Sequence, residues 1–360
     1  MTMTTAEPLR QDLVSDRSNK GFERLAEPFR RELKLHCYRM LGSLHEAEDL
    51  VQETYLRAWS SFHNFEGPKS SVRAWLYRIA TNACLNAIAS RKTMQRLLPD
   101  QMGPATTQLP DSHSPPATEV AWLEPYPDSD LDEIADSAPT PEALYASREA
   151  VQLAFIAAIQ ELPPRQRATL LLCDVLSWTA AEAARLLGSS TASINSALQR
   201  ARETLAKRYP AGRAPQLRPP NPTQQKLLAR YLAAWEEHDL DGFLALLKED
   251  ATLAMPPSPH WYVGRHDIRF FSTWAWPQCG GFRLLPTAAN GQPAFAVYQR
   301  GVDAQWAARS IHVLTLADDT ISALTVFGPP IGPQLFAAFG FPLILPEAVG
   351  AGSVSKPHQS

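Results

Sequence analysis

The chain has 360 residues, of which 45% are hydrophobic, and its 34 basic residues nearly balance its 37 acidic ones. This length predicts two or three domains, and the apolar content excludes a wholly disordered chain. The four cysteines, Cys37, Cys84, Cys173 and Cys279, form no Cys-x-x-Cys pair, which argues against a disulfide scaffold or zinc ribbon and suits a reducing cytoplasm. The polar start predicts no signal peptide, and glycines and prolines interrupt the uncharged stretch 321–346, so we expect no membrane span.

Charge and proline content divide the chain into segments. Residues 93–141 carry one basic residue, nine acidic residues and nine prolines, whereas the blocks on either side are mildly basic. A linker of this composition cannot bury enough apolar surface to fold alone, yet its residues Trp122, Leu123 and Tyr126 predict that it docks onto something. The predicted divisions are a flexible N-terminus (1–21), a helical domain (22–92), the acidic linker (93–141), a second helical domain (142–209), a short linker (210–221), a mixed domain (222–328) and an apolar, Pro-rich tail (329–360).

Residues 22–92 predict a helical bundle whose last helix, about 71–90, has two faces. One face is apolar, with Val72 and Leu76, and predicts core packing. The other face repeats aromatic, cationic and amide side chains at helical spacing, which suits nucleic-acid contact because Trp stacks on bases, Arg binds phosphate and Asn reads base edges. Its members are Ser71, Trp75, Arg78, Asn82 and Asn86. Taken alone, this pattern also fits an ordinary helix with a solvated face.

Residues 142–209 predict a helix-turn-helix. The run 179–182 has the form of a capping box, and Gly188 stands where a helix end favours positive φ. The helix after this turn would place small polar side chains at base edges in the major groove and arginines near phosphates. Arg165 and Arg167, on an upstream helix, could also reach phosphate. The alternative is a helical hairpin with a solvated basic face.

Residues 222–328 predict an α+β domain, because two helical segments precede a set of strand-like runs. The first helix begins with a cap at Asn221, and a second short helix runs over 240–248. Asp318 and Asp319 mark a hairpin turn, so we expect an antiparallel sheet. The expected strands are 251–255, 282–285, 294–299, 310–316 and 321–327.

The two helical blocks resemble the extracytoplasmic-function group of the sigma-70 family, which keeps only regions 2 and 4. Residues 47–54 (AEDLVQET) are similar to the polymerase-docking helix of region 2, and 71–82 (SVRAWLYRIATN) to its promoter-melting helix. Residues 162–167 (LPPRQR) and 179–202 are similar to region 4. The C-terminal block resembles SnoaL-like members of the NTF2 fold, and the chain is most similar to the sigma-G type. The implied fold class is two all-α sigma domains followed by an α+β SnoaL-like cone.

This resemblance implies a sigma factor that directs core RNA polymerase to promoters and catalyses no reaction. Its partners would be the polymerase, through the β′ clamp helices and the β flap, and promoter DNA, with no cofactor and no metal. The acidic linker would thread the channel that nascent RNA later occupies, where it would imitate RNA or act as a mere spacer. The residues implied are Asp49, Gln52 and Glu53 for polymerase; Phe62, Phe65, Trp75, Arg78 and Asn82 for the minus-ten element; and Arg165, Ser190, Thr191, Ser193, Asn195, Ser196 and Arg200 for the minus-35 element.

The SnoaL-like domain raises the question of catalysis, because enzymes of this fold use Asp/His pairs in the cone. The candidates are His260, Trp261, Tyr262, His266, Asp267 and His312. No spacing among them places a base beside an orienting group, so we expect a domain without chemistry that modulates sigma activity.

Two other functions stay open at this point: a one-component regulator that senses a small molecule and binds DNA without polymerase, and an enzyme with a vestigial DNA-binding module. The tail, rich in phenylalanine, is predicted to dock on the sigma part. The promoter sequence, any anti-sigma partner and any ligand of the extra domain are not predicted.

Overall fold

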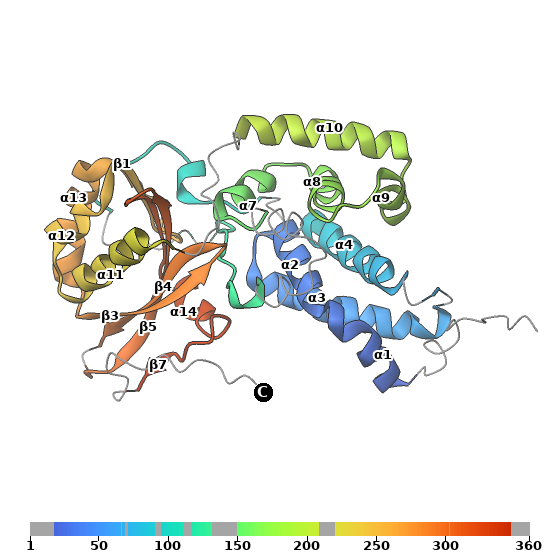
Figure 1. Ribbon diagram of the computed structural model, residues 1–360, viewed down its shortest axis with the longest axis horizontal. Coiled ribbons are helices and arrows are strands. Elements are labelled where there is room, and N and C mark those ends of the chain that lie inside the picture. Colours follow the sequence, from blue (N-terminus) through green and yellow to red (C-terminus); the bar gives the residue numbers. More distant parts are fainter. Residues whose placement is uncertain are drawn as a thin grey trace, which may run out of the picture. The chain divides into compact units, whose positions relative to one another are not determined.

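The computed structural model describes residues 18–65, 67–68, 71–90, 95–110, 117, 119–131, 150–208, 220–301 and 303–346. These residues fall into two compact units, which Figure 1 shows as a helical part and a part built on a sheet. The first unit combines Met1–Arg96 with Ala154–Pro210, and the second combines Leu97–Leu153 with Ala211–Ser360. The described linker residues from Leu97 to Leu131 therefore belong with the C-terminal domain. The N-terminus up to residue 17 lies outside the described residues, as does the predicted helix start at 140–141.

The first unit is helical, as predicted. Its N-terminal half contains α1 (Asn19–Ala26), η1 (Glu27–Phe29), α2 (Arg30–Leu41), α3 (Leu44–Ser61), η2 (Phe62–Asn64) and α4 (Val72–Ser90). Its C-terminal half contains α7 (Leu153–Gln160), α8 (Pro164–Leu170), a π-helical turn η5 (Leu171–Val175), α9 (Ala180–Leu187) and α10 (Thr191–Arg208).

Local sequence signals account for several helix ends in this unit. Gly42 ends α2 at φ 69°, and the Ser43 hydroxyl accepts a hydrogen bond from a backbone N–H in the first turn of α3. Thr179 and Glu182 form the predicted capping box of α9, with bonds of 2.8 and 3.2 Å. Gly188 ends α9 at φ 59°, so the predicted turn of the helix-turn-helix is confirmed.

A buried arginine joins the two halves of the first unit. Arg167, on α8, is 1% exposed and donates to the carbonyl of Met40 at the end of α2. It also donates to the side-chain and backbone oxygens of Gln160, each at 2.6 Å, and to the carbonyl of Leu162. The Gln160 amide in turn donates to the carbonyl of Arg39 at 3.2 Å. These bonds satisfy helix-end carbonyls that would otherwise be buried without donors.

The described residues of the second unit form one seven-stranded sheet in the order β2-β1-β6-β5-β4-β3, with β7 paired to β5. The strands are β1 (Leu247–Ala254), β2 (Trp261–Val263), β3 (Phe282–Ala289), β4 (Gln292–Arg300), β5 (Trp306–Ala317), β6 (Thr320–Phe327) and β7 (Ile344–Leu345). The predicted α+β class and the 318–319 hairpin are confirmed. The expectation of a purely antiparallel sheet is wrong, because β1 pairs with β6 in parallel.

Three helices, α11 (Pro222–Glu236), α12 (Leu240–Ala245) and α13 (Gly264–Ala275), with the turn η6 (Trp276–Gln278), complete the domain. An aromatic core lies between them and the sheet. Tyr231 stacks on Phe295 of β4 at 5.2 Å, and Trp235 packs against Trp276 at 4.9 Å. These large rings fill the interior of the cone.

The tail packs on the sheet of its own domain. Residues alternate across a strand, so Tyr298 of β4 points away from the face on which Phe295 contacts the helices. Phe336, which follows α14 (Ile331–Leu335), packs edge-on against Tyr298 at 5.1 Å, and the Tyr298 hydroxyl donates to the carbonyl of Pro342. The prediction of a docked tail is confirmed. The prediction that it docks on the sigma part is wrong for Phe336 and Pro342, which contact Tyr298 of the sheet.

Candidate nucleic-acid interface

One face of α3 carries the residues predicted to bind polymerase. Asp49 and Gln52 are exposed, and Glu53 is half-buried and pairs with Arg57 at 2.6 Å. Leu56 follows on the same face and is 66% exposed, an unusually large exposure for a leucine. The sequence reasoning missed Leu56, although its helical spacing from Gln52 and Glu53 was a usable signal. The face is therefore acidic and ends in an exposed apolar residue, which suits a complementary protein surface.

The polar stripe of α4 is exposed, as its spacing predicted. Arg78 and Asn82 are exposed, and Trp75 is half-buried. The indole of Trp75 lies against the ring of Phe65, with 4.7 Å between centroids and an angle of 38°. Adjacent aromatic and cationic side chains of this kind can stack on bases and bind phosphates of a single strand.

Phe62 does not belong to this surface. It is 3% exposed and packs edge-on against Phe22 of α1 at 5.4 Å. Its burial in the core argues against the predicted direct contact with a flipped base. Among the described residues predicted for the minus-ten element, Phe65 and Trp75 are then the aromatic side chains on the α4 surface. Residues 66, 69 and 70 of the neighbouring loop lie outside the described residues.

The N-terminal part of α10 presents the residues predicted to read the upstream element. Ser190, Thr191, Ser193, Asn195, Ser196 and Arg200 are all exposed. The Ser190 hydroxyl accepts from the backbone N–H of Ser193 at 3.2 Å, so it caps the helix. Further along, Arg202 is held by Asp174 at 2.6 and 2.9 Å, and this bonding raises the pKa of its guanidinium.

The two arginines of α8 differ in exposure. Arg165 is exposed and stays a candidate for phosphate contact. Arg167 is buried among the carbonyls of Met40, Gln160 and Leu162, so the expectation that it reaches phosphate is wrong in this conformation. Sequence spacing alone could not distinguish them, because both are polar residues in the first turns of one helix.

The linker runs along the C-terminal sheet domain. The backbone N–H of Thr106 donates to the carbonyl of Trp261 on β2 at 2.9 Å. The Trp261 indole donates to the carbonyl of Gly103, and the Tyr262 hydroxyl donates to that of Gln108. Two of the residues considered for catalysis, Trp261 and Tyr262, therefore hold the linker instead.

The hairpin between β3 and β4 fixes the end of the described linker. Asn290, at φ 56°, accepts from the backbone N–H of Tyr126 at 2.8 Å and donates from its own N–H to the Tyr126 carbonyl at 2.9 Å. Its side-chain amide also donates to the carbonyl of Val151 at 2.6 Å. Gly291 donates to the Asp128 carboxylate at 2.8 Å. Asn290 is fully buried, so these bonds are shielded from water.

The apolar residues of the linker are buried, as the docking prediction required. Trp122 is 4% exposed, and Leu123 and Tyr126 are 0% exposed. The Asn-Gly sequence at 290–291 is a strong hairpin signal that the sequence reasoning did not use. Nothing in the sequence, however, connects that turn with residue 126.

The remaining candidates for catalysis are dispersed. His312 is buried, and its Nδ1 shares a hydrogen bond of 2.8 Å with the Tyr231 hydroxyl. Burial, with the charge of Arg309 nearby, lowers the pKa of His312 to about 3. His266 is exposed at the start of α13, next to the half-buried Asp267, and His260 bonds to Ser258 at 3.1 Å. The structure does not bring them together as an acid–base pair.

Two searches over the described ranges give negative results. No helix there is long and apolar enough to cross a membrane. No group of three or more His, Cys, Asp or Glu residues is placed to bind a metal ion in that part of the chain.

Comparison with known families matches three segments of the chain. Residues 25–93 match the family model of sigma-70 region 2, residues 152–205 match sigma-70 region 4, and residues 228–324 match the SnoaL-like domain. The order is the one expected from the motifs.

Individual proteins are similar over longer stretches. The chain is 44% identical over 333 residues to the ECF RNA polymerase sigma factor SigG of Mycobacterium tuberculosis, which covers 91% of this chain and 86% of that protein. It is 30% identical over 170 residues to SigE of Mycolicibacterium smegmatis, which covers 47% and 54% of the two chains. The crystal structure of M. tuberculosis SigJ matches with a TM-score of 0.54 at 24% identity, covering 91% of this chain and 100% of that one, and so shares the fold.

Proposed function

This chain belongs to the extracytoplasmic-function RNA polymerase sigma factors, and we propose that its SnoaL-like domain controls transcription initiation by holding the acidic linker. As a sigma factor, it binds core RNA polymerase and promoter DNA and directs initiation. The family consists of initiation factors, not enzymes, and the dispersed histidines fit a domain with a regulatory role.

The observation that carries the proposal is the capture of the linker by Asn290. Its side chain bonds both to Tyr126 and to Val151, which lie on either side of the stretch 132–149. A linker bound along β2 and the β3–β4 hairpin cannot also thread a channel of the polymerase. Linker release would therefore precede or accompany productive binding, and its free energy would set the basal activity.

In vitro transcription with core polymerase tests this proposal. We would compare the full chain, the chain ending at Pro210 and the variant Asn290→Ala on promoters selected from a library. Both changed proteins should initiate more strongly than the full chain, because each frees the linker. Equal initiation by all three would contradict restraint by the domain, and a loss of initiation would show that linker capture assists it.

A matched control separates linker release from backbone strain. Asp318 also has positive φ, 53°, in the β5–β6 hairpin, and its side chain has no recorded bond to the linker. Asp318→Ala therefore introduces a similar strain at a hairpin of the same sheet. It should leave initiation unchanged if the linker is what matters.

We also propose the α3 face as the docking site for the polymerase clamp, with Asp49, Gln52 and Glu53 followed by Leu56. Asp49→Lys and Leu56→Glu should each weaken binding to core polymerase by tenfold or more, about the effect of one lost interface anchor. Glu23→Lys, an exposed charge reversal on α1, is the control. If Glu23→Lys weakens polymerase binding as much as Asp49→Lys does, the effect follows net charge rather than position, and this docking site is contradicted.

For DNA, we propose that Phe65, Trp75, Arg78 and Asn82 hold the melted minus-ten strand. We propose that the exposed N-terminal face of α10, with Arg165 and Arg200, contacts the minus-35 element. Trp75→Ala should reduce promoter opening, measured by permanganate reactivity, while leaving polymerase binding intact. Arg200→Ala should weaken promoter binding at a fixed salt concentration and lower its salt dependence.

A further inference from the structure

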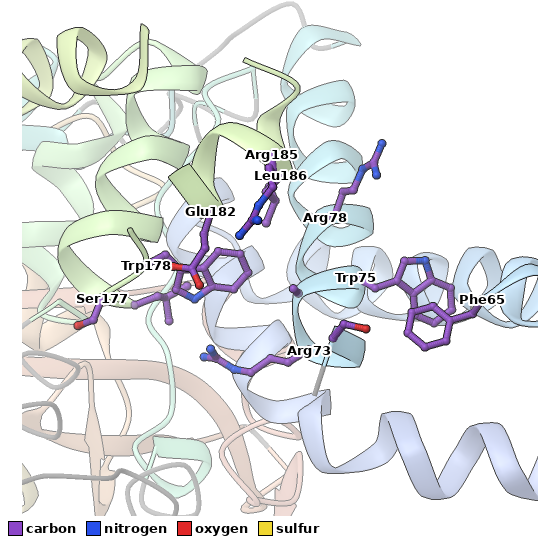
Figure 2. A pocket seen from close by; sticks show the side chains of 12 residues that line it. Phe65, Arg73, Trp75, Arg78, Ser177, Trp178, Glu182, Arg185 and Leu186 are labelled. Atoms are coloured by element: carbon purple, nitrogen blue, oxygen red, sulfur yellow. The ribbon is translucent and has the colours of Figure 1, made fainter. Parts of the chain in front are cut away.

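A cavity of about 610 Å³ lies in the first unit, between α4 and the segment that leads from η5 into α9. Figure 2 shows side chains from both halves of the unit around it. This volume lies within the range of small-molecule sites. Its lining includes Arg73, Trp75, Arg78, Trp178, Glu182 and Arg185.

One wall of the cavity is rigid and aromatic. The Trp178 indole lies 5.4 Å from the ring of Tyr77, and the guanidinium of Arg73 lies 5.9 Å from the Trp178 ring. Arg73 is fixed by a two-pronged bond to Glu32 at 3.0–3.1 Å. Trp75, packed against the ring of Phe65, also belongs to the lining, but in Figure 2 both rings project from the other side of α4. Planar ligands bind well to aromatic walls that are already held in place.

The cavity also has cationic groups available to an anion. Arg78 and Arg185 are exposed. The charge of Arg185 also contributes, after the bonds from Thr179, to the lowered pKa of the neighbouring Glu182 carboxyl. In Figure 2 the side chain of Arg185 extends beside Trp178. The single carboxylate of the lining, Glu182, accepts bonds from the backbone and hydroxyl of Thr179 at 2.8 and 2.7 Å. Glu32 already balances Arg73, and Arg78 extends away from Trp178 in Figure 2, so Arg185 is the arginine placed to meet an anion beside the Trp178 wall.

We propose that this cavity binds a free mononucleotide, whose base packs on the Trp178 wall and whose phosphate is bound by Arg185. A ligand in this place touches both α4 and α9, so it stabilises the packing of the two sigma halves on each other. It also occupies the surface of Trp75 and Arg78 proposed for the minus-ten strand. A nucleotide would thus lower initiation, independently of the linker.

Equilibrium binding to the full chain tests the site without polymerase, so its outcome is separate from that of the linker proposal. The probes are GMP and AMP, the matching nucleosides, and ribose 5-phosphate, measured by calorimetry and by quenching of tryptophan fluorescence. We expect the nucleotides to bind more tightly than either the nucleosides or the sugar phosphate. Arg185→Ala should weaken nucleotide binding about tenfold or more and leave nucleoside binding unchanged, since it removes one charged hydrogen-bond donor.

Two further arms make the result specific. Arg230→Ala, an exposed arginine of α11, should leave nucleotide binding unchanged. A single-stranded minus-ten oligonucleotide has the same bases and phosphates as the mononucleotide, but it is proposed to bind on the α4 side. Arg185→Ala should therefore not weaken the binding of the oligonucleotide. Trp178→Ala should weaken nucleotide binding in the calorimeter and reduce the fluorescence change caused by nucleotides. The proposal is overturned if no nucleotide binds at millimolar concentration, if Arg230→Ala weakens binding as much as Arg185→Ala, or if the oligonucleotide is the only ligand bound.

Discussion

Both units contain a buried polar side chain that joins segments distant in the sequence, but the segments differ in kind. In the first unit, Arg167 binds the carbonyls of Met40, Gln160 and Leu162, all of which end or follow helices. In the second, Asn290 binds Tyr126 and Val151, which lie outside helices and strands.

This difference determines what is released when each contact breaks. Helices satisfy most of their own backbone hydrogen bonds. The two sigma halves therefore keep their secondary structure when the hydrogen bonds of the Arg167 guanidinium break. The described linker residues bond in part to one another, as Leu97 does to Ala121 and Leu123, and in part to the SnoaL-like domain, as Tyr126 does to Asn290. The first contact therefore joins folded helices, whereas the second holds an irregular segment on the sheet domain.

The largest effect is expected from Arg167→Ala. It leaves several buried carbonyls without donors and creates a cavity, so it should cost about 3–5 kcal/mol of stability in the first unit. Hydrogen exchange of α2 in the full chain measures this loss. Arg165→Ala, two residues away and exposed, should change it by less than about 0.5 kcal/mol. Equal protection in both variants would show that Arg167 does not join the halves.

Asn290→Ala should have the next largest effect, about 2–4 kcal/mol, because it removes two buried hydrogen bonds and places alanine at positive φ. The measurement is hydrogen exchange of residues 119–131. These amides should lose protection while the strands keep theirs. Asp318→Ala adds only the backbone strain and should leave residues 119–131 protected from exchange. If these amides lose protection in Asp318→Ala as well, the loss comes from a disturbed sheet and not from the Asn290 hydrogen bonds.

Acid should weaken both units, because each buries a neutral histidine. Burial lowers the pKa of His36, near Arg39 and Arg73, and that of His312, near Arg309, to about 3 from an ordinary value of 6.5. Between those values the unfolded chain binds more protons. This stability is therefore complete above pH 6.5 and is lost as the pH falls toward 3.

The expected loss is about 1.4 kcal/mol per histidine at pH 5.5. Urea unfolding at pH 7.5 and 5.5, followed by exchange in each unit, measures it. His36→Gln should remove the acid sensitivity of the first unit alone, and His312→Gln that of the second. If the loss of stability at pH 5.5 survives both substitutions, groups other than His36 and His312 cause it.

The smallest effect is expected from Asp174→Asn. The Asp174–Arg202 pair has bonds of 2.6 and 2.9 Å but exposed side chains, so it should contribute less than about 1 kcal/mol, and less again at high salt. A double-mutant cycle with Arg202→Ala isolates the pair. A coupling that persists in 1 M salt would contradict its assignment as a surface contact.

The predictions that succeeded concern signals within a few residues of one another. The 179–182 capping box, the turn at Gly188 and the exposure of Arg78 and Asn82 on one stripe of α4 all follow from helical geometry. The errors concern burial and pairing between distant parts. The family resemblance placed Phe62, and its charge placed Arg167, on a binding surface, but both side chains are buried in the core.

The sequence by itself determined the order of the domains, their fold classes and the helix-turn-helix, because caps, turns and periodicity act over one or two turns of chain. Only the tertiary structure decided where the linker goes, what Arg167 binds and which surface receives the tail. Tyr126 and Asn290 are 164 residues apart, and Arg167 and Met40 are 127 apart. No local pattern encodes such pairs, since each depends on which buried donors and acceptors the packing of whole elements brings together.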